Sequence, residues 1–331
     1  MLDTTVLLMI VVFLALAFDY INGFHDTANA IATVVSTRAL TPRRAILMSA
    51  VLNFVGALYK TAVAKTIAKD IVSPSLVTQE VVIGALVGAI AWNLLTWYYG
   101  IPSSSSHAII GGVMGAAVMK AGFGVLKWAG VKKVLMALVI SPVLGGLMGL
   151  VIMYLLLFLF GNMSPSKVNK NSLRLQILTA GVLSFNHGSN DAQKSMGIIT
   201  LALLSAGVIP TADVPTWVKL SCALAMALGT AAGGWRIIRT MGSKIFKIEP
   251  MYGCAAELSA STVIWGATEF GLPVSTTHVV SGSIMGVGAT KRLTAIRWGV
   301  ARQMFIAWIL TIPATALVAA GVYYVLNLIN R

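Results

Sequence analysis

Apolar residues fill most of this chain in long runs separated by short polar stretches. The runs cover approximately 4–37, 43–64, 81–99, 101–119 and 131–160, and then 174–208, 216–235, 250–269, 271–290 and 297–328. Two stretches, Val134 to Phe160 and Gln303 to Asn330, contain no charged residue. Both exceed the roughly 20 residues that a helix needs to cross about 30 Å of hydrocarbon. Because backbone groups find no water there, the runs are predicted to be helices.

Five runs precede and five follow the polar stretch "GNMSPSKVNKNS", which is rich in turn-forming residues. This pattern predicts a first half at 1–160, a connecting loop at 161–173 and a second half at 174–331. Two motifs recur in both halves at nearly equal spacing, which indicates a tandem duplication. "GIPSSSSHAIIGGVMG" at 100–115 aligns without gaps on "GLPVSTTHVVSGSIMG" at 271–286, and "NGFHDTANA" at 22–30 aligns on "HGSNDAQKS" at 187–195.

An odd number of crossings in each half means that the second half enters the membrane in the opposite sense, as in many secondary transporters. The predicted fold is therefore an all-α polytopic membrane protein with two inverted-topology repeats, broken or re-entrant helices and about 10–12 transmembrane segments. Placing both termini outside the cell puts nine of the ten arginines at cytoplasmic ends, as the positive-inside rule requires. The basic stretch 120–133 is the exception, and a re-entrant segment at 101–119 would explain it.

Composition supports a membrane location. With 57% hydrophobic and 10% charged residues, a chain of 331 residues has too little polar surface for a soluble globule. The net charge of +14 comes without an aromatic stacking pattern, so nucleic acid is not an expected partner. Cys222 and Cys254 lie in apolar runs without metal or redox spacing and are interpreted as packing residues. Met1 to Phe18 lacks the basic start of a cleavable signal peptide.

Two carboxylates, Asp26 and Asp191, occupy matching places in the first repeated motif. A carboxylate at the middle of the membrane costs roughly 2.5 to 3.5 kcal/mol, and a cation would offset that cost. Carboxylate and amide oxygens suit hard alkali or alkaline-earth ions. The run at 4–37 is long for one crossing, which predicts helices broken at Gly23 and Gly188. The alternative is a polar pair that only cross-links helices, with Lys194 neutralising Asp191.

The second repeated motif, "PSSSSH" and "PVSTTH", has a different chemistry. Pro102 and Pro273 suit the first turn of a helix, and the hydroxyl groups after them are good capping residues. A helix that begins there directs unpaired amides and its positive dipole end into the protein, which is typical of an anion site. The alternative is an ordinary capped helix start, with some hydroxyls bonded back to helix carbonyls.

The histidines of the chain all fall inside these motifs, at His25, His107, His187 and His278. They are expected to orient carboxylates or to carry protons. Three acidic residues stay outside the predicted primary site. Glu257 and Glu269 lack counterparts in the first half, and Asp19 is interpreted as a residue of a vestibule or of a helix end.

"GFHDTANAIATVVSTRAL", "SFNHGSNDAQKSMGIIT" and the two hydroxyl motifs resemble the repeated signatures of the inorganic phosphate transporter (PiT) family of sodium- or proton-coupled phosphate permeases. The resemblance covers essentially the whole chain and implies phosphate bound between the halves, usually in a homodimer. His25 stands where the family pattern places Asn. The implied phosphate ligands are Ser103, Ser104, Ser105, Ser106, Ser275, Thr276, Thr277, Asn22 and Asn190. The expected cation ligands are Asp26, Asp191, Asn22, Asn29, Asn186, Asn190 and Ser184, with sodium at Asp26 and Asp191.

The expected function is that of a secondary active symporter in the cell membrane. It would import inorganic phosphate with sodium by alternating access, surrounded by membrane lipid, without a cofactor and without enzymatic activity. A proton-coupled or metal-phosphate symporter of the same fold is the alternative. An intramembrane Ser/His hydrolase is disfavoured because adjacent residues on a helix, as in "SH", do not face each other. An anion channel would differ by its lack of saturable uphill uptake, and sulfate as the substrate remains open.

Overall fold

The computed structural model describes residues 4–329, which are helical apart from turns and an isolated β-bridge between Val72 and Leu126. The first half contains α1 (Thr4–Ser36), α2 (Pro42–Ala57), α3 (Ala62–Asp70), η1 (Pro74–Leu76), α4 (Gln79–Tyr99), α5 (Ser105–Ala121), η2 (Phe123–Val125) and α6 (Trp128–Phe160). The second half contains α7 (Pro165–Ser205), α8 (Thr216–Ala232), α9 (Trp235–Arg239), η3 (Thr240–Lys244), α10 (Pro250–Glu269), α11 (Thr276–Lys291), η4 (Leu293–Ala295) and α12 (Trp298–Ile329). The order of elements is thus nearly the same in both halves.

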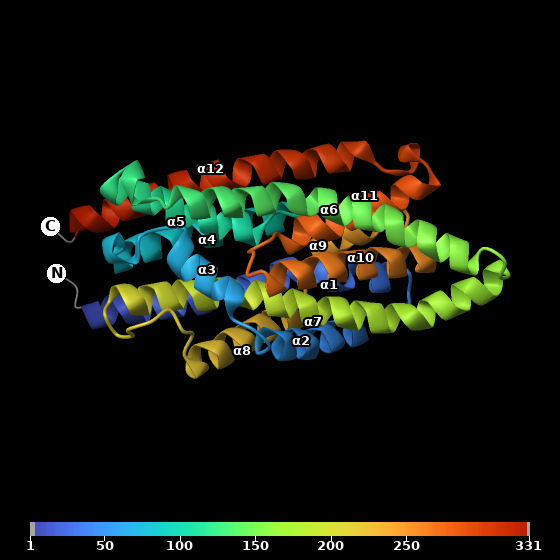
Figure 1. The fold of residues 1–331 in the computed structure, drawn as a ribbon, viewed down its shortest axis with the longest axis horizontal. Helices are drawn as coiled ribbons and strands as arrows, with labels where there is room; N and C mark the ends of the chain where they lie inside the picture. Colours follow the sequence, from blue (N-terminus) through green and yellow to red (C-terminus); the bar gives the residue numbers. More distant parts are fainter. Residues whose placement is uncertain (1–3, 330–331) are drawn as a thin grey trace.

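Corresponding helices of the two halves run in opposite directions (Figure 1). α1 leads away from the end of the molecule that holds both termini, and α7 leads back towards it. α6 and α12 differ in the same way. This arrangement is the one that an inverted repeat requires, and it leaves the two ends of the chain on the same side of the protein.

Several helices of each half pack against helices of the other half. α1 packs on α8 and α2 packs on α7, while α5 packs on α12 and α11 packs on α6. One hydrophobic cluster accordingly joins buried side chains from both halves, such as Phe18, Leu86 and Ile199. Neither half forms a separate core, because the apolar faces of each are covered by the other.

The predicted breaks at Gly23 and Gly188 are wrong, since α1 and α7 run through these glycines as continuous helices. The glycines allow two helices to approach closely. A Cβ atom on Gly23 would lie 2.5 Å from the carbonyl oxygen of Met226 on α8. A Cβ atom on Gly188 would collide with the backbone of Asn53 on α2. A small residue is therefore required by packing, and the helical hydrogen bonds are kept.

Breaks do occur elsewhere. α2 and α3 meet at a bend of 64°, and α8 meets the α9–η3 segment at a bend of 62°. Non-helical segments also precede α5 and α11, and each includes a glycine with a left-handed backbone, Gly100 (φ 66°) and Gly271 (φ 64°). The short helices α3 and α9 were not predicted, because their sequences "AVAKTIAKD" and "WRIIR" are too short and too polar to stand out by hydropathy.

The connection between the halves is shorter than the predicted loop at 161–173. α7 begins at Pro165, so 161–164 is the part without helix. Pro165 fits the first helical turn, and polar residues after it extend the helix beyond the apolar run. Within residues 4–329, α1, α4, α6 and α12 are each long and apolar enough to cross a membrane, and each bent pair qualifies as one further span. The predicted count of 10–12 segments stays a prediction.

Candidate functional site

The two hydroxyl motifs meet at the starts of α5 and α11. Ser104 caps α5 by accepting a hydrogen bond from the His107 amide at 3.1 Å, and Ser275 caps α11 in the same way from the His278 amide at 3.2 Å. The His107 and His278 rings pack together with their centroids 4.6 Å apart. Ser106 Oγ donates to the Val274 carbonyl at 2.8 Å. The positive ends of two helix dipoles, one from each half, therefore face the same region.

The two predicted carboxylates lie beside each other in this region. Ligand atoms of Asp26 on α1, Asp191 on α7 and His187 on α7 all lie within 4.8 Å of one another. Asp26 is 2% exposed and Asp191 is fully buried. The motifs of the two halves, far apart in sequence, thus contribute to one buried group of acidic side chains.

Hydroxyl groups from both motifs donate to these carboxylates. Asp26 accepts from Ser105 Oγ at 2.9 Å and from Thr277 Oγ1 at 3.3 Å. Asp191 accepts from Thr276 Oγ1 at 3.2 Å. Asn29 Nδ2 donates to Thr276 Oγ1 at 3.2 Å and to Thr277 Oγ1 at 3.0 Å. Asp26 is therefore bonded by hydroxyls of both halves at once.

The charged neighbours of the two carboxylates differ. Lys194 Nζ lies 2.9 Å from Asp191 Oδ1 and donates to Ser105 Oγ at 2.9 Å, so its ammonium connects α7 with the start of α5. Asp26 Oδ1 instead lies 2.7 Å from Nδ1 of its neighbour His25. With neutral histidines, two carboxylates and one ammonium leave this buried group with one net negative charge.

Two histidines and the side chains that contact them also belong to the cluster. His25 Nε2 lies 3.1 Å from Thr96 Oγ1, which in turn lies 2.8 Å from Ser103 Oγ. His187 lies 3.5 Å from Asp191 Oδ2, and its Nδ1 contacts Asn53 Oδ1 at 3.1 Å. Ser103 Oγ also lies 3.4 Å from His25 Nε2, so one side chain separates it from Asp26. His25 and His187 contact the carboxylates directly, whereas the His107 ring packs on the His278 ring, which also packs on Trp308.

Several predicted ligands make their described contacts elsewhere. Asn190 Nδ2 donates to Thr268 Oγ1 at 3.0 Å, Asn186 Nδ2 donates to the Ser261 carbonyl at 3.2 Å, and Ser184 Oγ donates to the Ala180 carbonyl at 2.8 Å. Asn22 is fully buried, and within residues 4–329 its amide group has no hydrogen-bond partner. The side-chain oxygens of Asn29 and Asn190 are likewise without a described partner.

Lys194 was considered from the sequence as a residue that neutralises Asp191, and the structure places the two charged groups 2.9 Å apart. Thr96 and Asn53 were not assigned, because neither belongs to a repeated motif. Glu257, which was left outside the predicted site, is buried and accepts hydrogen bonds from Thr33, Gln176 and Thr179. Glu269 is paired with Lys60.

A short helix of each half holds the turn before the other half's hydroxyl motif. Thr66 Oγ1 on α3 donates to the Gly271 carbonyl at 2.8 Å, and Thr240 Oγ1 on η3 donates to the Gly100 carbonyl at 2.9 Å. The guanidinium group of Arg236 also donates to the Tyr98 carbonyl and lies 5.5 Å from the centre of the Trp97 ring. These contacts hold the non-helical segments that precede α5 and α11, next to the buried group.

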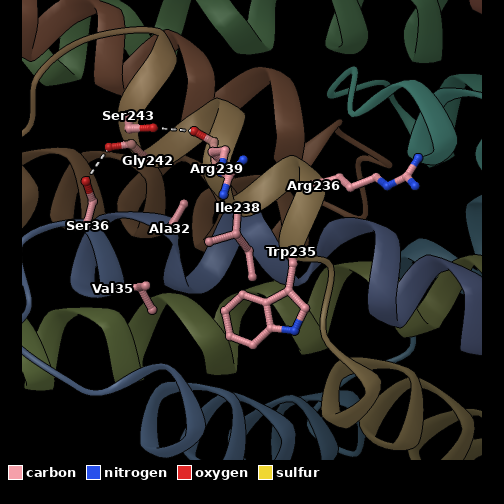
Figure 2. A pocket seen from close by; sticks show the side chains of 9 residues that line it. All are labelled: Ala32, Val35, Ser36, Trp235, Arg236, Ile238, Arg239, Gly242 and Ser243. Carbon is pink, nitrogen blue, oxygen red and sulfur yellow. Dashed lines mark hydrogen bonds between the residues drawn. The ribbon is translucent and has the colours of Figure 1, made fainter.

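A cavity of about 540 Å³ lies next to Arg236, between the end of α1 and the α9–η3 segment (Figure 2). Its lining residues are Ala32, Val35, Ser36, Trp235, Arg236, Ile238, Arg239, Gly242 and Ser243. Ser36 Oγ donates to the Gly242 carbonyl, which ties α1 to η3 at the cavity wall. Asn29 lies one turn before Ala32 on α1, so the cavity adjoins the helix that carries Asp26.

Comparison with known proteins relates this arrangement to a family. Residues 22–319 match the model of the phosphate transporter family. A "Probable low-affinity inorganic phosphate transporter" of Bacillus subtilis is 53% identical over 98% of each chain, and one of Rhizobium meliloti is 46% identical over 98% of this chain and 97% of the other. A solved structure titled "The sodium-dependent phosphate transporter" superposes with a TM-score of 0.90 at 30% identity, covering 98% of this chain and all of the other.

Proposed function

This chain belongs to the phosphate transporter family, a family of transporters rather than enzymes, and from this premise we propose that it imports inorganic phosphate together with sodium. The transport would be secondary active symport by alternating access. The similarity of fold to a protein named as sodium-dependent supports the choice of ion. The arrangement of charges at Asp26, Asp191 and Lys194 supports the coupling.

The observation that carries this proposal is the buried group of two carboxylates, one ammonium and the hydroxyls around them. Phosphate is an anion, and the group already has one net negative charge. Two unit charges 4 Å apart interact by about 4 kcal/mol at an effective dielectric constant near 20. Phosphate entering alone would therefore be repelled, whereas a sodium ion at the carboxylates cancels the net charge of the group and removes that repulsion. Coupling then follows from charge balance.

The proposed phosphate ligands are the groups that carry positive charge or donate hydrogen bonds. Lys194 supplies the charge, and Ser105, Thr276 and Thr277 supply hydroxyls that now donate to the carboxylates. The α5 and α11 starts add amides and the positive ends of their dipoles. Ser103, Ser104, Ser106 and Ser275 act beside them as the capping and supporting hydroxyls of the same turns.

The proposed sodium ligands are oxygens. Asp26 and Asp191 carry the charge, and the unpartnered amide oxygens of Asn22, Asn29 and Asn190 are suited to complete the shell. Asn186 and Ser184 donate hydrogens to backbone carbonyls, which leaves their side-chain oxygens able to coordinate a cation. We extend the proposal to a homodimer in lipid with both termini outside the cell and with the two halves as the rocking units.

Purified protein in proteoliposomes tests the proposal. Labelled phosphate should accumulate against its gradient when sodium is higher outside, and a proton gradient alone should drive little uptake. Asp26→Asn and Asp191→Asn should each abolish sodium-driven accumulation while leaving a folded protein, judged by its elution profile and helicity. Normal sodium-driven uptake by both variants would refute the assignment of these carboxylates to the coupling site.

A proton-coupled symporter is the second candidate, and one contact favours it. His25 Nδ1 lies 2.7 Å from Asp26 Oδ1, so a proton held between them would neutralise the first-half carboxylate. Concentrative uptake driven by protons without sodium, together with its loss in His25→Gln, would support this candidate over sodium.

A further inference from the structure

A groove on the outside of the protein, between α6 and α10, is not part of the site described above. It has a volume of about 750 Å³ and is lined mostly by apolar side chains. Met136, Ile140 and Leu144 come from α6, and Val263 and Phe270 come from α10. This volume lies within the range of about 300–1,000 Å³ that is usual for ligand sites. The groove is therefore large enough for a ligand with an apolar body.

Two lysines stand at one end of this groove, near the start of α6. Lys132 and Lys133 are exposed, and within residues 4–329 neither has an ion-pair or hydrogen-bond partner. The uncharged apolar run of α6 begins directly after them, at Val134, so their ammonium groups can reach the depth of lipid head groups. Both belong to the basic stretch 120–133, which the positive-inside rule does not explain.

A second apolar groove, of about 520 Å³, follows the same helix and is lined by α6 residues. It shares Lys132, Met136 and Ile140 with the first groove, so both grooves adjoin the same lysine. Between Lys132 and Met148, at the far end of the first groove, α6 rises about 24 Å. This length exceeds half of the roughly 30 Å of hydrocarbon, which is the depth that one acyl chain occupies. Two apolar grooves beside a positive charge match a phospholipid with two chains.

The counterpart of the first groove, between α4 and α12, is filled. When the alignment of the hydroxyl motifs is continued towards the N-terminus, Val263 corresponds to Trp92. Trp92 Nε1 donates to Thr311 Oγ1 at 2.9 Å, which joins α4 to α12. Ser141 occupies the place in α6 that Thr311 occupies in α12, and it donates to the Leu138 carbonyl of its own helix at 3.1 Å. The groove is thus open where its counterpart holds a tryptophan.

We propose that this groove binds an anionic phospholipid, with the lipid phosphate at Lys132 and Lys133 and the acyl chains along α6. A zwitterionic lipid brings no net charge to the two ammonium groups, whereas each basic residue beside an anionic lipid improves binding about fivefold. A second copy of this chain fits less well, because a two-fold axis through the groove would bring the same lysines of both copies together. The binding of lipid does not rest on the proposed transport.

The groove also reaches the hydroxyl motif of the second half. Leu272 and Val274, in the non-helical segment before α11, line it. The Val274 carbonyl accepts a hydrogen bond from Ser106 Oγ, and the next residue, Ser275, caps α11. An acyl chain in the groove packs against this segment and restricts its motion. The lipid therefore acts on the phosphate site through packing, an effect whose importance for transport rests on the proposed function.

Binding of lipid to the purified protein in a neutral detergent tests the head-group site. Phosphatidylglycerol and phosphatidylcholine with the same acyl chains are titrated, and native mass spectrometry counts the lipids bound to each chain. The wild type should bind one phosphatidylglycerol about 25-fold more tightly than phosphatidylcholine, a factor of about five for each lysine. Lys132→Gln with Lys133→Gln should abolish this preference. Lys167→Gln with Lys170→Gln, which removes two exposed lysines of α7, is the matched control and should keep it.

Gly266→Leu tests the apolar part of the groove. Gly266 lies in the groove wall on α10, and a Cβ atom there would meet no other atom within 4 Å, so leucine extends into the groove. Binding of phosphatidylglycerol should weaken about tenfold, because part of an acyl chain loses its contact. Gly321→Leu on α12, which also has open space at its Cβ position, is the control. Phosphatidylglycerol should slow hydrogen exchange at 271–275 in the control and not in Gly266→Leu.

Equal affinities of the wild type for the two lipids would overturn the head-group site, as would an unchanged preference in Lys132→Gln with Lys133→Gln. Binding by Gly266→Leu that matches Gly321→Leu would overturn the groove. If Gly266→Leu instead converts a dimer to a monomer and leaves lipid binding unchanged, the groove belongs to an interface between two copies and the proposal fails. Phosphate uptake is not among these measurements, so a failure of the proposed symport would leave the result for the lipid unaltered.

Discussion

The two halves place equivalent carboxylates in different electrostatic surroundings. Asp191 has a full positive charge beside it, the ammonium of Lys194 at 2.9 Å, whereas Asp26 has the imidazole of His25 at 2.7 Å and two hydroxyl donors. The position that matches Lys194 in the first half is held by Asn29. The two matching carboxylates therefore differ in charge balance: Asp191 is paired with an ammonium, whereas Asp26 is hydrogen-bonded by neutral groups.

Removal of Lys194 should give the largest effect on stability, because it removes the positive charge that distinguishes the surroundings of Asp191 from those of Asp26. Lys194→Met leaves Asp191 buried beside Asp26 without its ammonium, and loss of one partner of a buried ion pair costs about 3–5 kcal/mol. The free energy of unfolding in detergent, measured by denaturant titration, should fall by that amount. His25→Gln, which removes the imidazole beside Asp26, should cost less, about 1.5 kcal/mol, because one hydrogen bond from a neutral donor to a carboxylate is lost.

The double variant Asp191→Asn with Lys194→Met sharpens the result. Removal of both charges should restore most of the stability lost in Lys194→Met, since no buried charge is left alone. A double variant as unstable as Lys194→Met would show that the lysine stabilises the fold by packing, and the difference between the halves would not be electrostatic.

Substitution of the paired glycines should give the next largest effect. Gly23→Ala and Gly188→Ala each push a Cβ atom into the backbone of a helix from the other half, so α1 must separate from α8, or α7 from α2. Overpacking of this kind costs typically about 1–3 kcal/mol. The thermal midpoint in detergent should fall for both variants. Gly299→Ala on α12, whose Cβ atom would meet no other atom within 4 Å, is the control and should be neutral or slightly stabilising.

Gly23→Ala and Gly188→Ala that matched the control would contradict the close packing of α1 with α8 and of α7 with α2. A large effect from only one of the two glycines would show that the α1–α8 and α7–α2 contacts contribute unequally to stability, although their geometry is similar.

The hydroxyl groups should separate the halves more finely. Ser105 Oγ donates to Asp26 and accepts from Lys194, while Thr277 Oγ1 contacts Asp26 at the longer distance of 3.3 Å. Ser105→Ala should therefore weaken phosphate binding about tenfold, which corresponds to about 1.4 kcal/mol, close to the contribution of a hydrogen bond from a neutral group to a charged one. Thr277→Val, which keeps the shape of the side chain, should weaken it about threefold. Phosphate binding at saturating sodium measures both, and equal affinities in Ser105→Ala and the wild type would contradict a contact between this hydroxyl and phosphate.

Much of this arrangement could be predicted from the sequence, because the two halves carry matching motifs that can be compared with each other. Hydropathy located ten of the helices, and the repeated motifs identified Asp26, Asp191 and the hydroxyls as partners in one site. In an inverted fold, the two copies of a repeated motif are expected to lie close together between the halves. The fold class and the resemblance to phosphate transporters are confirmed by the family match and by the solved structure.

The features that were not predicted depend on contacts that a sequence does not show. Gly23 and Gly188 were interpreted as helix breakers, yet glycine serves close helix packing equally well, and only the neighbouring backbone decides between the two. α3 and the α9–η3 segment carry too many polar residues to register as membrane segments. Asp19 was interpreted as a residue of a vestibule or of a helix end, because a helix broken at Gly23 would end close to it, whereas α1 continues through Gly23 and buries Asp19 fully.

The two threonine contacts should give the smallest effects and the sharpest distinction between the halves. Thr66→Val and Thr240→Val each remove one hydrogen bond, to the Gly271 and Gly100 carbonyls respectively, and keep the shape of the side chain. A neutral hydrogen bond contributes about 0.5–1.5 kcal/mol, so the opening of one turn should become about twofold to tenfold more frequent. Hydrogen exchange of backbone amides should rise at 100–104 in Thr240→Val and at 271–275 in Thr66→Val. If both variants speed exchange at both turns, the two approaches open as one unit, and the alternation that the proposed transport cycle requires does not reside in these contacts.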